Sequence, residues 1–375
     1  MKLLFVIRDD AAFLRHRLPI ATGALNQGYE VHLIANETGF GSEISQRGFV
    51  FHKLSADFSR HKLFVTMKIW MRLVVLFWKL KPNIIHLSST YFSLVGALAA
   101  YFAPRVPTII SFTGLGYAFT REKGFFPTLI KLLRPLIAII WNTNTVFPLY
   151  QNVDDAKLLK TAGLVTKPYA IIPGAGVNTK RFSPSQKIAT RSKFVIGCAT
   201  RLLKDKGLVE LIEAMIALYP KNPNVHLKIA GAIDPFNPSS LTETEINRFH
   251  DEANISFVGE QLDMVDFWQS CDAAILVSHR EGMPKALLEA ASCGLPLIAS
   301  DVPGCKELIH NSKNGFLVKP RDPQEISRAI NLLALDNEFA LRAGEASRAL
   351  IFAKGLDEES VASEYTKLLL RLTES

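Results

Sequence analysis

Short apolar segments alternate with longer helical stretches along this sequence, and the alternation starts a second time past the middle. The first series of β-rich runs comprises Leu3–Ile7, Val31–Ala35, Ile84–Leu87 and Thr108–Phe112. The second comprises Phe194–Cys198, Val225–Ala230, Ile255–Val258, Ala273–Val277, Leu295–Ala299 and Phe316–Val318. Strands that alternate with helices form parallel βαβ units. The sequence therefore predicts an α/β fold of two doubly wound, Rossmann-like domains.

The turn-rich segment Pro173-Gly174-Ala175-Gly176 separates the two series. We expect an N-terminal domain over residues 1–180, a C-terminal domain over 181–355, and a final helix over 356–375 that packs back toward the N-terminal domain. A length of 375 residues suits this division. Ligands of open α/β sheets bind outside the carboxyl ends of the strands, so two facing domains are expected to enclose a central cleft.

Charge is distributed unevenly between the two halves. Residues 1–180 carry 21 Lys and Arg against 9 Asp and Glu, a net charge of +12, whereas residues 181–375 carry 22 against 26, a net charge of −4. In the basic half, residues 60–81 and 124–141 combine cations with aromatic and aliphatic side chains. Such helices can lie in a bilayer interface, where each cation contributes about 1 kcal/mol near anionic lipid. Packing of both helices on the N-terminal sheet is the alternative, and the charge asymmetry favours an anionic membrane surface as a partner.

The cysteines and the apolar runs bear on location. Four cysteines show neither Cys-x-x-Cys spacing nor the density of a disulfide framework, which favours a reducing compartment. The apolar run at residues 3–7 is too short for a signal peptide. Cations interrupt the run at residues 63–80, so no bilayer-spanning segment is expected. We therefore expect a cytoplasmic protein, peripheral on the inner face of the plasma membrane.

The segment after the predicted strand Ala273–Val277 has the features of an anion site. Pro284 suits the first turn of a helix and Gly294 suits its C-terminal exit. Backbone N–H groups of Gly282, Met283 and the residues up to Lys285 would then lie at the positive end of this helix. Gly282 also allows close approach of a ligand to the main chain.

Two carboxylates accompany this anion site. Glu281 belongs to the loop, and Glu289 lies about one and a half turns into the predicted helix. Carboxylates accept hydrogen bonds from hydroxyl groups but repel phosphate, so a ligand with both a diphosphate and sugar hydroxyls satisfies both features. A nucleotide sugar is such a ligand. The alternative is an ordinary capped helix with two surface glutamates.

These residues resemble the donor-site signature of glycosyltransferase family 4, the retaining enzymes of the two-domain GT-B fold. The resemblance rests on Glu281, seven intervening residues, Glu289 and the run from residue 290 to 307. Residues 173–182 resemble the family's interdomain turn. The resemblance covers essentially the whole C-terminal half and, more loosely, the N-terminal half.

A second patch, residues 199–207, resembles the family's Gly-Arg-Leu…Lys-Gly segment. It implies that Arg201 and Lys206 bind the donor diphosphate; without the resemblance they would be interpreted as a solvated surface pair. The family pattern further implies that Glu289 binds the ribose and Glu281 the transferred sugar. Residues Val258 and Gly259 are expected to border the nucleobase.

The family transfers a sugar with retention, usually explained by front-face attack in which a phosphate oxygen of the leaving group takes the acceptor proton. Such a step needs charge stabilisation on the leaving diphosphate rather than acid or base side chains. No Asp-x-Asp motif occurs, and no His, Cys or Glu cluster has metal-ligand spacing. We expect no catalytic metal and no cofactor, with the nucleotide sugar as a substrate.

The N-terminal half departs from the family pattern. Many relatives have a Gly-Gly loop after the first strand and a histidine after a later one, and this sequence lacks both, so the family histidine has no counterpart here. Gly114 and Gly116 suit close approach of a ligand, although a lone Gly-x-Gly is a weak signal. His16 and Arg17 are further candidates on the acceptor side, near the start of a helix expected over 16–27. A histidine at a helix start is, alternatively, a polar neighbour of the cap.

Residues 114–119 and 301–305 together resemble the subgroup that builds lipid-linked oligosaccharides for bacterial surface glycans. This narrower resemblance implies transfer of N-acetylgalactosamine or another N-acetylhexosamine, α1,3-linked, from a UDP-sugar to an undecaprenyl diphosphate-linked saccharide. One alternative is a soluble family 4 enzyme acting on a small or polymeric carbohydrate. Another is a non-enzymatic polyanion-binding protein, although no motif indicates a nucleic-acid partner.

Overall fold

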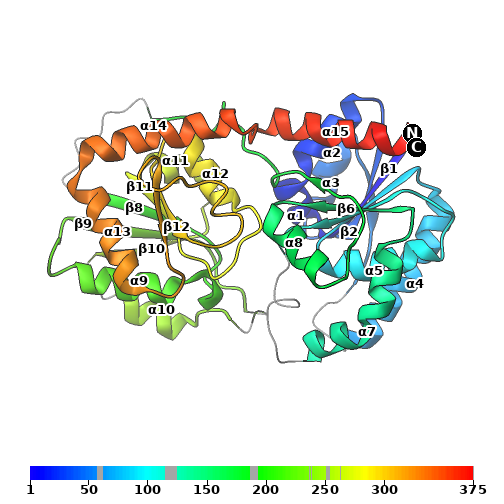
Figure 1. Cartoon of the computed structure of the whole chain (residues 1–375), viewed down its shortest axis with the longest axis horizontal. Helices are drawn as coiled ribbons and strands as arrows, with labels where there is room; N and C mark the ends of the chain where they lie inside the picture. The colour runs from blue at the N-terminus through cyan, green and yellow to red at the C-terminus, as the bar shows by residue number, and fades with distance from the viewer. Residues whose placement is uncertain are drawn as a thin grey trace. The chain divides into compact units, whose positions relative to one another are not determined.

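The computed structural model describes residues 1–56, 62–114, 125–185, 193–235, 237, 239–250, 254–261 and 263–374. The chain forms two compact units, one of Met1–Ala175 with Glu358–Ser375 and one of Gly176–Asp357 (Figure 1). It thus divides after Ala175 and after Asp357, where the sequence suggested residues 180 and 355.

The first unit contains a seven-stranded parallel sheet with the order β3-β2-β1-β4-β5-β6-β7. Its strands are β1 (Lys2–Asp9), β2 (Glu30–Asn36), β3 (Val50–Lys53), β4 (Ile84–Ser88), β5 (Thr108–Phe112), β6 (Val146–Tyr150) and β7 (Ala170–Ile171). Its helices are α1 (Asp10–His16), α2 (Leu18–Asn26), α3 (Gly41–Gln46), α4 (Lys62–Leu80), α5 (Thr90–Tyr101), α7 (Phe125–Trp141), α8 (Val153–Thr161) and α15 (Glu358–Glu374). The strand order reverses between β1 and β4. At such a switch point the loops after the two strands diverge and leave a crevice at the carboxyl edge.

Side chains of β1 enter two apolar clusters, one on each face of the sheet. Leu4 and Val6 pack with residues of α4, α5 and α7, whereas Leu3 and Phe5 pack with residues of α2 and α15. Burial on both faces explains why the strand is apolar at consecutive positions.

Helix α15 closes the first unit, although it follows the second unit in sequence. It packs on α2 (Figure 1). Gly23 allows the close contact, because a Cβ atom there would lie 2.9 Å from Cβ of Ala362. Tyr365 and Leu369 of this helix are buried in the core of the first unit.

The second unit contains a six-stranded parallel sheet with the order β10-β9-β8-β11-β12-β13. Its strands are β8 (Phe194–Ala199), β9 (Val225–Ala230), β10 (Ile255–Gly259), β11 (Ala273–Leu276), β12 (Leu297–Ser300) and β13 (Gly315–Val318). Its helices are η1 (Lys204–Lys206), α9 (Leu208–Leu218), α10 (Glu243–His250), α11 (Met264–Gln269), α12 (Lys285–Ser292), α13 (Pro323–Leu335) and α14 (Asn337–Ala353). Here the switch point lies between β8 and β11.

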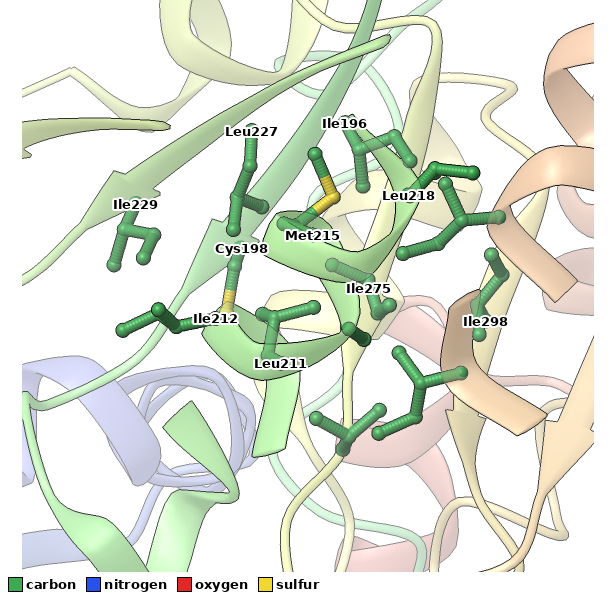
Figure 2. Close-up of a cluster of buried hydrophobic side chains, with 14 of the residues drawn as sticks. Ile196, Cys198, Leu211, Ile212, Met215, Leu218, Leu227, Ile229, Ile275 and Ile298 are labelled. Atoms are coloured by element: carbon green, nitrogen blue, oxygen red, sulfur yellow. The ribbon is translucent and has the colours of Figure 1, made fainter. Parts of the chain in front are cut away.

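Figure 2 shows the apolar cluster on one face of this second sheet. Helix α9 contributes Leu211, Ile212, Met215 and Leu218, and the strands contribute Ile196, Cys198, Leu227, Ile229, Ile275 and Ile298. The i, i+1, i+4, i+7 spacing of the α9 residues is that of one helix face turned to a core.

Two features of the first unit differ from the expectation. Strands β3, β6 and β7 were not predicted; β3 and β7 are short strands at the edges of the sheet, and β6 contains Pro148. The helix expected over 16–27 is α2, which begins only at Leu18; His16 belongs to the preceding helix α1, and Arg17 between the two has a φ of −128°, which is not helical. Pro19 is tolerated in the first turn of α2 but would break a continuous helix. His16 consequently ends a helix instead of starting one.

Candidate active site

The loops that follow β8 and β11 meet at the switch point of the second unit. These strands are neighbours, with Ala273 of β11 paired to Ile196 of β8. Arg201 and Lys206 follow β8, and Glu281 follows β11. The topology therefore brings together residues that lie 75 positions apart, such as Lys206 and Glu281.

Lys206 and Glu281 form an ion pair at this edge of the sheet. The Lys206 Nζ atom lies 2.6 Å from Glu281 Oε1, and the side chains are 21% and 13% exposed. Gly207 makes the approach possible: its φ is 71°, and a Cβ atom there would lie 2.1 Å from the carbonyl oxygen of Val277. Only glycine lets the η1 turn lie this close to the end of β11.

His279 ties the same two loops together, and sequence reasoning did not single it out. Its backbone N–H donates to the Asp205 carbonyl at 3.0 Å, and its Nε2 lies 2.9 Å from Glu210 Oε1 of α9. The loop that carries Glu281 is thus fixed to both η1 and α9.

Helix α12 begins at Lys285 and has no side-chain cap at its N-terminus. The sequence predicted Pro284 within the first turn, but it precedes the helix in an extended conformation (φ −76°, ψ 108°) and is its N-cap residue. Gly294, at φ 77°, ends the helix as expected, and Leu295 N–H donates to the Ala290 carbonyl. Gly282 and Met283 precede Pro284 and therefore lie two to three residues before the start of the helix.

Glu289 points into the unit from α12 and is only 8% exposed. The Trp268 indole Nε1 donates to its Oε2 at 3.4 Å, and Lys285 Nζ lies 3.9 Å from its Oε1. Glu281 is also largely buried, so the alternative of two surface glutamates is wrong. Trp268 was not recognised from the sequence, where nothing marks it apart from an ordinary core aromatic residue.

Arg201 has a different carboxylate partner from Lys206. Its Nη1 lies 3.0 Å from Oδ2 of Asp234, and the side chain is 57% exposed. The loops after β8 and β9 touch at Gly231, where a Cβ atom would lie 1.8 Å from the Thr200 carbonyl oxygen. Asp234 belongs to a turn-rich segment to which the sequence assigned no function.

Val258 and Gly259 end strand β10 beside this region. The Gly259 carbonyl accepts from Gly231 N–H at 2.9 Å. Gly259 has a φ of 69°, and no atom lies within 4 Å of the place a Cβ would take, so a ligand can approach its backbone.

The acceptor-side candidates lie in the first unit. His16 is exposed at the end of α1, whereas Arg17 is buried against the ends of β4 and β5. Gly114 has a φ of 102°, and its carbonyl accepts from Thr90 Oγ1 at 3.4 Å. Gly116 lies outside the described residues, as does most of the 114–119 run.

In the part of the chain that the structure describes, no three His, Cys, Asp or Glu side chains are grouped so that they could hold a metal ion. Burial raises the pKa of Cys198 and that of Cys293 to about 12, so neither is a thiolate near neutral pH. Within the same residues, every helix is too short or too polar to span a bilayer.

Two doubly wound parallel sheets with this switch-point site define a glycosyltransferase of the GT-B fold. Residues 179–350 match the model of glycosyl transferases group 1, and residues 2–144 match that of glycosyl transferase 4-like proteins. The chain belongs to glycosyltransferase family 4, whose members transfer a sugar from a nucleotide sugar with retention.

The chain is similar along its length to characterised relatives. It is 27% identical, over 99% of both chains, to N,N'-diacetylbacillosaminyl-diphospho-undecaprenol alpha-1,3-N-acetylgalactosaminyltransferase of Campylobacter jejuni. It is also 27% identical to UDP-Gal:alpha-D-GlcNAc-diphosphoundecaprenol alpha-1,3-galactosyltransferase of Escherichia coli, over 81% of this chain and 80% of the relative. The crystal structure of Anabaena HepE in complex with UDP-glucose superposes with a TM-score of 0.79 at 19% identity, covering 99% of this chain and 100% of that one.

Proposed function

We propose that this chain transfers an N-acetylhexosamine, N-acetylgalactosamine by preference, from its UDP derivative to an undecaprenyl diphosphate-linked saccharide, forming an α1,3 linkage. The observation that carries this proposal is the similarity, across 99% of both chains, to the Campylobacter jejuni relative, whose name states the sugar, the α1,3 linkage and a diphospho-undecaprenol-linked acceptor. The buried glutamates and the cations of the second unit supply a donor site that suits a nucleotide sugar.

The donor roles follow from charge and burial. Glu289, held by Trp268 and close to Lys285, is fixed as an acceptor for the ribose hydroxyls. Glu281 takes the hydroxyls of the transferred sugar. The groups assigned to the diphosphate are Arg201, Lys206 and the backbone of residues 282–285, which leads into α12. Val258 and Gly259 border the nucleobase.

Transfer proceeds on one face of the sugar. The bond between the anomeric carbon and the β-phosphate oxygen breaks, the acceptor hydroxyl oxygen bonds to the same face of that carbon, and its proton passes to the departing phosphate. Nucleoside diphosphate is released. Lys206 and Arg201 stabilise the negative charge that grows on the leaving group, which is the largest demand that such a step makes on the protein.

Helix α4 supports a membrane-bound acceptor. One of its faces packs on the first sheet through Ile69, Leu73 and Phe77. The opposite face is also apolar and exposed, with Leu63, Phe64, Met67, Met71, Val75 and Trp78. Exposed Lys68, Arg72 and Lys79 stand among these side chains. An apolar face rimmed by cations suits the interface of an anionic bilayer.

A second helix and a groove extend this surface. Helix α7 buries Ile137, Ile140 and Trp141 but exposes Leu132, Leu133, Leu136 and Ile139. An open groove of about 800 Å³ runs beside α4, lined by Phe64, Ile69, Met71 and Val75 together with Lys68 and Arg72. Packing on the sheet and contact with lipid are therefore compatible, because they use opposite faces of each helix.

The donor is tested by measuring release of nucleoside diphosphate from a panel of UDP-N-acetylgalactosamine, UDP-N-acetylglucosamine, UDP-galactose and UDP-glucose. Each reaction contains a short-chain polyprenyl diphosphate-linked saccharide and is run with and without EDTA. We expect turnover to be highest with UDP-N-acetylgalactosamine and unchanged by EDTA. Turnover confined to a soluble sugar acceptor would reject the lipid-linked assignment.

Membrane association is tested by sedimentation with vesicles that contain anionic lipid. The double variant Phe64→Ser/Val75→Ser removes apolar contact from α4 without touching its buried face. We expect binding to weaken by about 30-fold or more, since each of the two lost side chains forfeits roughly 1 kcal/mol or more of apolar transfer. The control is Leu341→Ser, which alters an equally exposed leucine of α14. Equal binding by all three proteins would count against α4 as the contact.

A further inference from the structure

Arg17 lies at the switch point of the first unit and is buried there. The residue is only 3% exposed. Its Nε donates a hydrogen bond to Ser88 Oγ at 3.0 Å, and its Nη2 donates one to Ser111 Oγ at 3.1 Å. Ser88 is the last residue of β4, and Ser111 is the last but one of β5. The guanidinium therefore lies at the carboxyl ends of two neighbouring strands, where ligands of doubly wound sheets bind.

The charge of Arg17 has no opposite charge beside it. Among the residues that the structure describes, its remaining contact is a 3.4 Å hydrogen bond from Nη1 to the His16 carbonyl, and no Asp or Glu forms an ion pair with it. Burial lowers the pKa of Arg17 only to about 10, so the side chain is a cation at neutral pH. A buried cation is ordinarily paired, because removing it from water is costly.

Two titratable side chains that interact with Arg17, His86 and Tyr365, are neutral and do not balance its charge. His86 Nδ1 and the Tyr365 hydroxyl are 2.6 Å apart, and both groups interact electrostatically with Arg17. Burial and the charge of Arg17 hold the pKa of His86 well below its usual value, and burial raises the pKa of Tyr365 well above its own. Neither group compensates the positive charge.

The group formed by Arg17, Ser88 and Ser111 has more hydrogen-bond donors than acceptors. A guanidinium has five N–H groups, of which the three contacts above use three. Each serine hydroxyl accepts from Arg17 and keeps its own O–H, and neither hydroxyl donates to an acceptor in the described ranges. Positive charge with surplus donors is the chemistry that recognises a phosphate oxygen.

We propose that Arg17, with Ser88 and Ser111, forms a binding site for the phosphate or diphosphate group of the acceptor. This assignment rests on the proposed function, because an undecaprenyl diphosphate-linked saccharide carries such a group. The released nucleoside diphosphate is a second source of the same chemistry, and the test must separate the two.

The test compares Arg17→Met with Arg47→Met by isothermal titration calorimetry, using geranyl diphosphate, inorganic pyrophosphate and UDP as separate probes. Arg47 is the matched control, an arginine of the same unit that is exposed and paired with Glu43 at 2.7 Å. We expect Arg17→Met to bind geranyl diphosphate and pyrophosphate about tenfold or more weakly and to bind UDP normally, since a charge-assisted contact is lost. Arg47→Met should bind all three as the parent does.

Other outcomes reject the proposal. Unchanged affinity of Arg17→Met for geranyl diphosphate would remove the anion site. A loss confined to UDP would assign the site to the donor instead of the acceptor. These titrations measure binding and need no sugar transfer. The anion site can therefore be rejected while the proposed transferase activity holds, and the transferase activity can be rejected while the anion site holds.

Thermal unfolding separates binding from a structural role. Because Arg17→Met removes an uncompensated buried charge, its unfolding temperature should equal or exceed that of the parent. A fall in unfolding temperature with normal geranyl diphosphate binding would make Arg17 a structural tie between β4 and β5. Ser111→Ala provides a second variant that keeps the charge, and we expect it to weaken geranyl diphosphate binding about threefold to tenfold.

Discussion

The loop after β8 in the second unit and the helix pair after β1 in the first occupy equivalent places, each beside the point where its sheet reverses strand order. Both carry a cation to that edge. Lys206 meets a carboxylate there, with 2.6 Å between Lys206 Nζ and Glu281 Oε1. Within the residues that the structure describes, Arg17 donates hydrogen bonds to two serine hydroxyls and a carbonyl. Each unit thus holds a cation at its switch point, but the cation of the second unit is paired with a carboxylate and that of the first is hydrogen-bonded to neutral groups.

Under the two proposals, one architecture serves two different ligands. In the second unit the charge is balanced, and a carboxylate remains to accept sugar hydroxyls beside the cations, which suits a ligand with both hydroxyl and phosphate groups. In the first unit the charge is unbalanced, which suits a ligand that is mainly anionic. The net charges of +12 over residues 1–180 and −4 over residues 181–375 follow the same division.

The largest effect should come from the paired site of the second unit. We expect Lys206→Ala to lower turnover about 10²- to 10³-fold, because one cation that stabilises the leaving diphosphate is lost. Glu289→Ala should raise the KM for the nucleotide sugar more than it lowers kcat, since its role is to bind ribose. Steady-state kinetics of nucleoside diphosphate release measure both. Full turnover in either variant would contradict the donor assignment.

The second-largest effect should be on the stability of the backbone that holds the Lys206–Glu281 ion pair. Gly207→Ala should destabilise the second unit by roughly 2–3 kcal/mol, because the new Cβ meets a backbone oxygen at a positive φ. Gly28→Ala is the control in the first unit: its φ is 82°, but no atom lies within 4 Å, so about 1 kcal/mol is expected. Hydrogen exchange of peptides from each unit measures the two losses separately. Equal losses would mean that the close approach at Val277 contributes nothing.

The smallest effect is a pH dependence that should differ between the units. Since the pKa of buried His86 in the folded chain lies well below 6.5, the unfolded chain binds the extra proton first as pH falls. Stability of the first unit should therefore decrease below pH 6.5, by at most about 1.4 kcal/mol per pH unit from this group. In His86→Gln that loss should be smaller, as measured by hydrogen exchange between pH 7.5 and 5.5. His226 lies in the second unit, has a lowered pKa for the same reason and is unchanged in the variant, which makes it an internal reference. A parallel pH profile in parent and variant would rule out His86 as the source.

The structure agrees with the sequence prediction for the α12 segment where the signal is local. Gly294 was predicted to end this helix, and it does so at a positive φ that glycine adopts readily. The strand at β11 then delivers Glu281 to the carboxyl edge of the sheet. Asp234 and His279 escaped notice because their partners, Arg201 and Glu210, lie 33 and 69 residues away.

The sequence by itself determined the alternation of strands and helices, the two-sheet architecture and the family signature of the donor site. Hydrophobic periodicity and glycine conformation act over short distances, so they can be recognised in the linear chain. Only the tertiary structure decided that α4 is apolar on the face turned away from the sheet as well as on the buried one, because periodicity does not say which stripe a neighbour covers. It likewise decided that Arg17 is buried and that no carboxylate among the described residues pairs with it. Burial and charge compensation depend on which strands lie side by side. Ser88 of β4 and Ser111 of β5 lie 71 and 94 residues from Arg17 in sequence, and the fold brings them into contact with it.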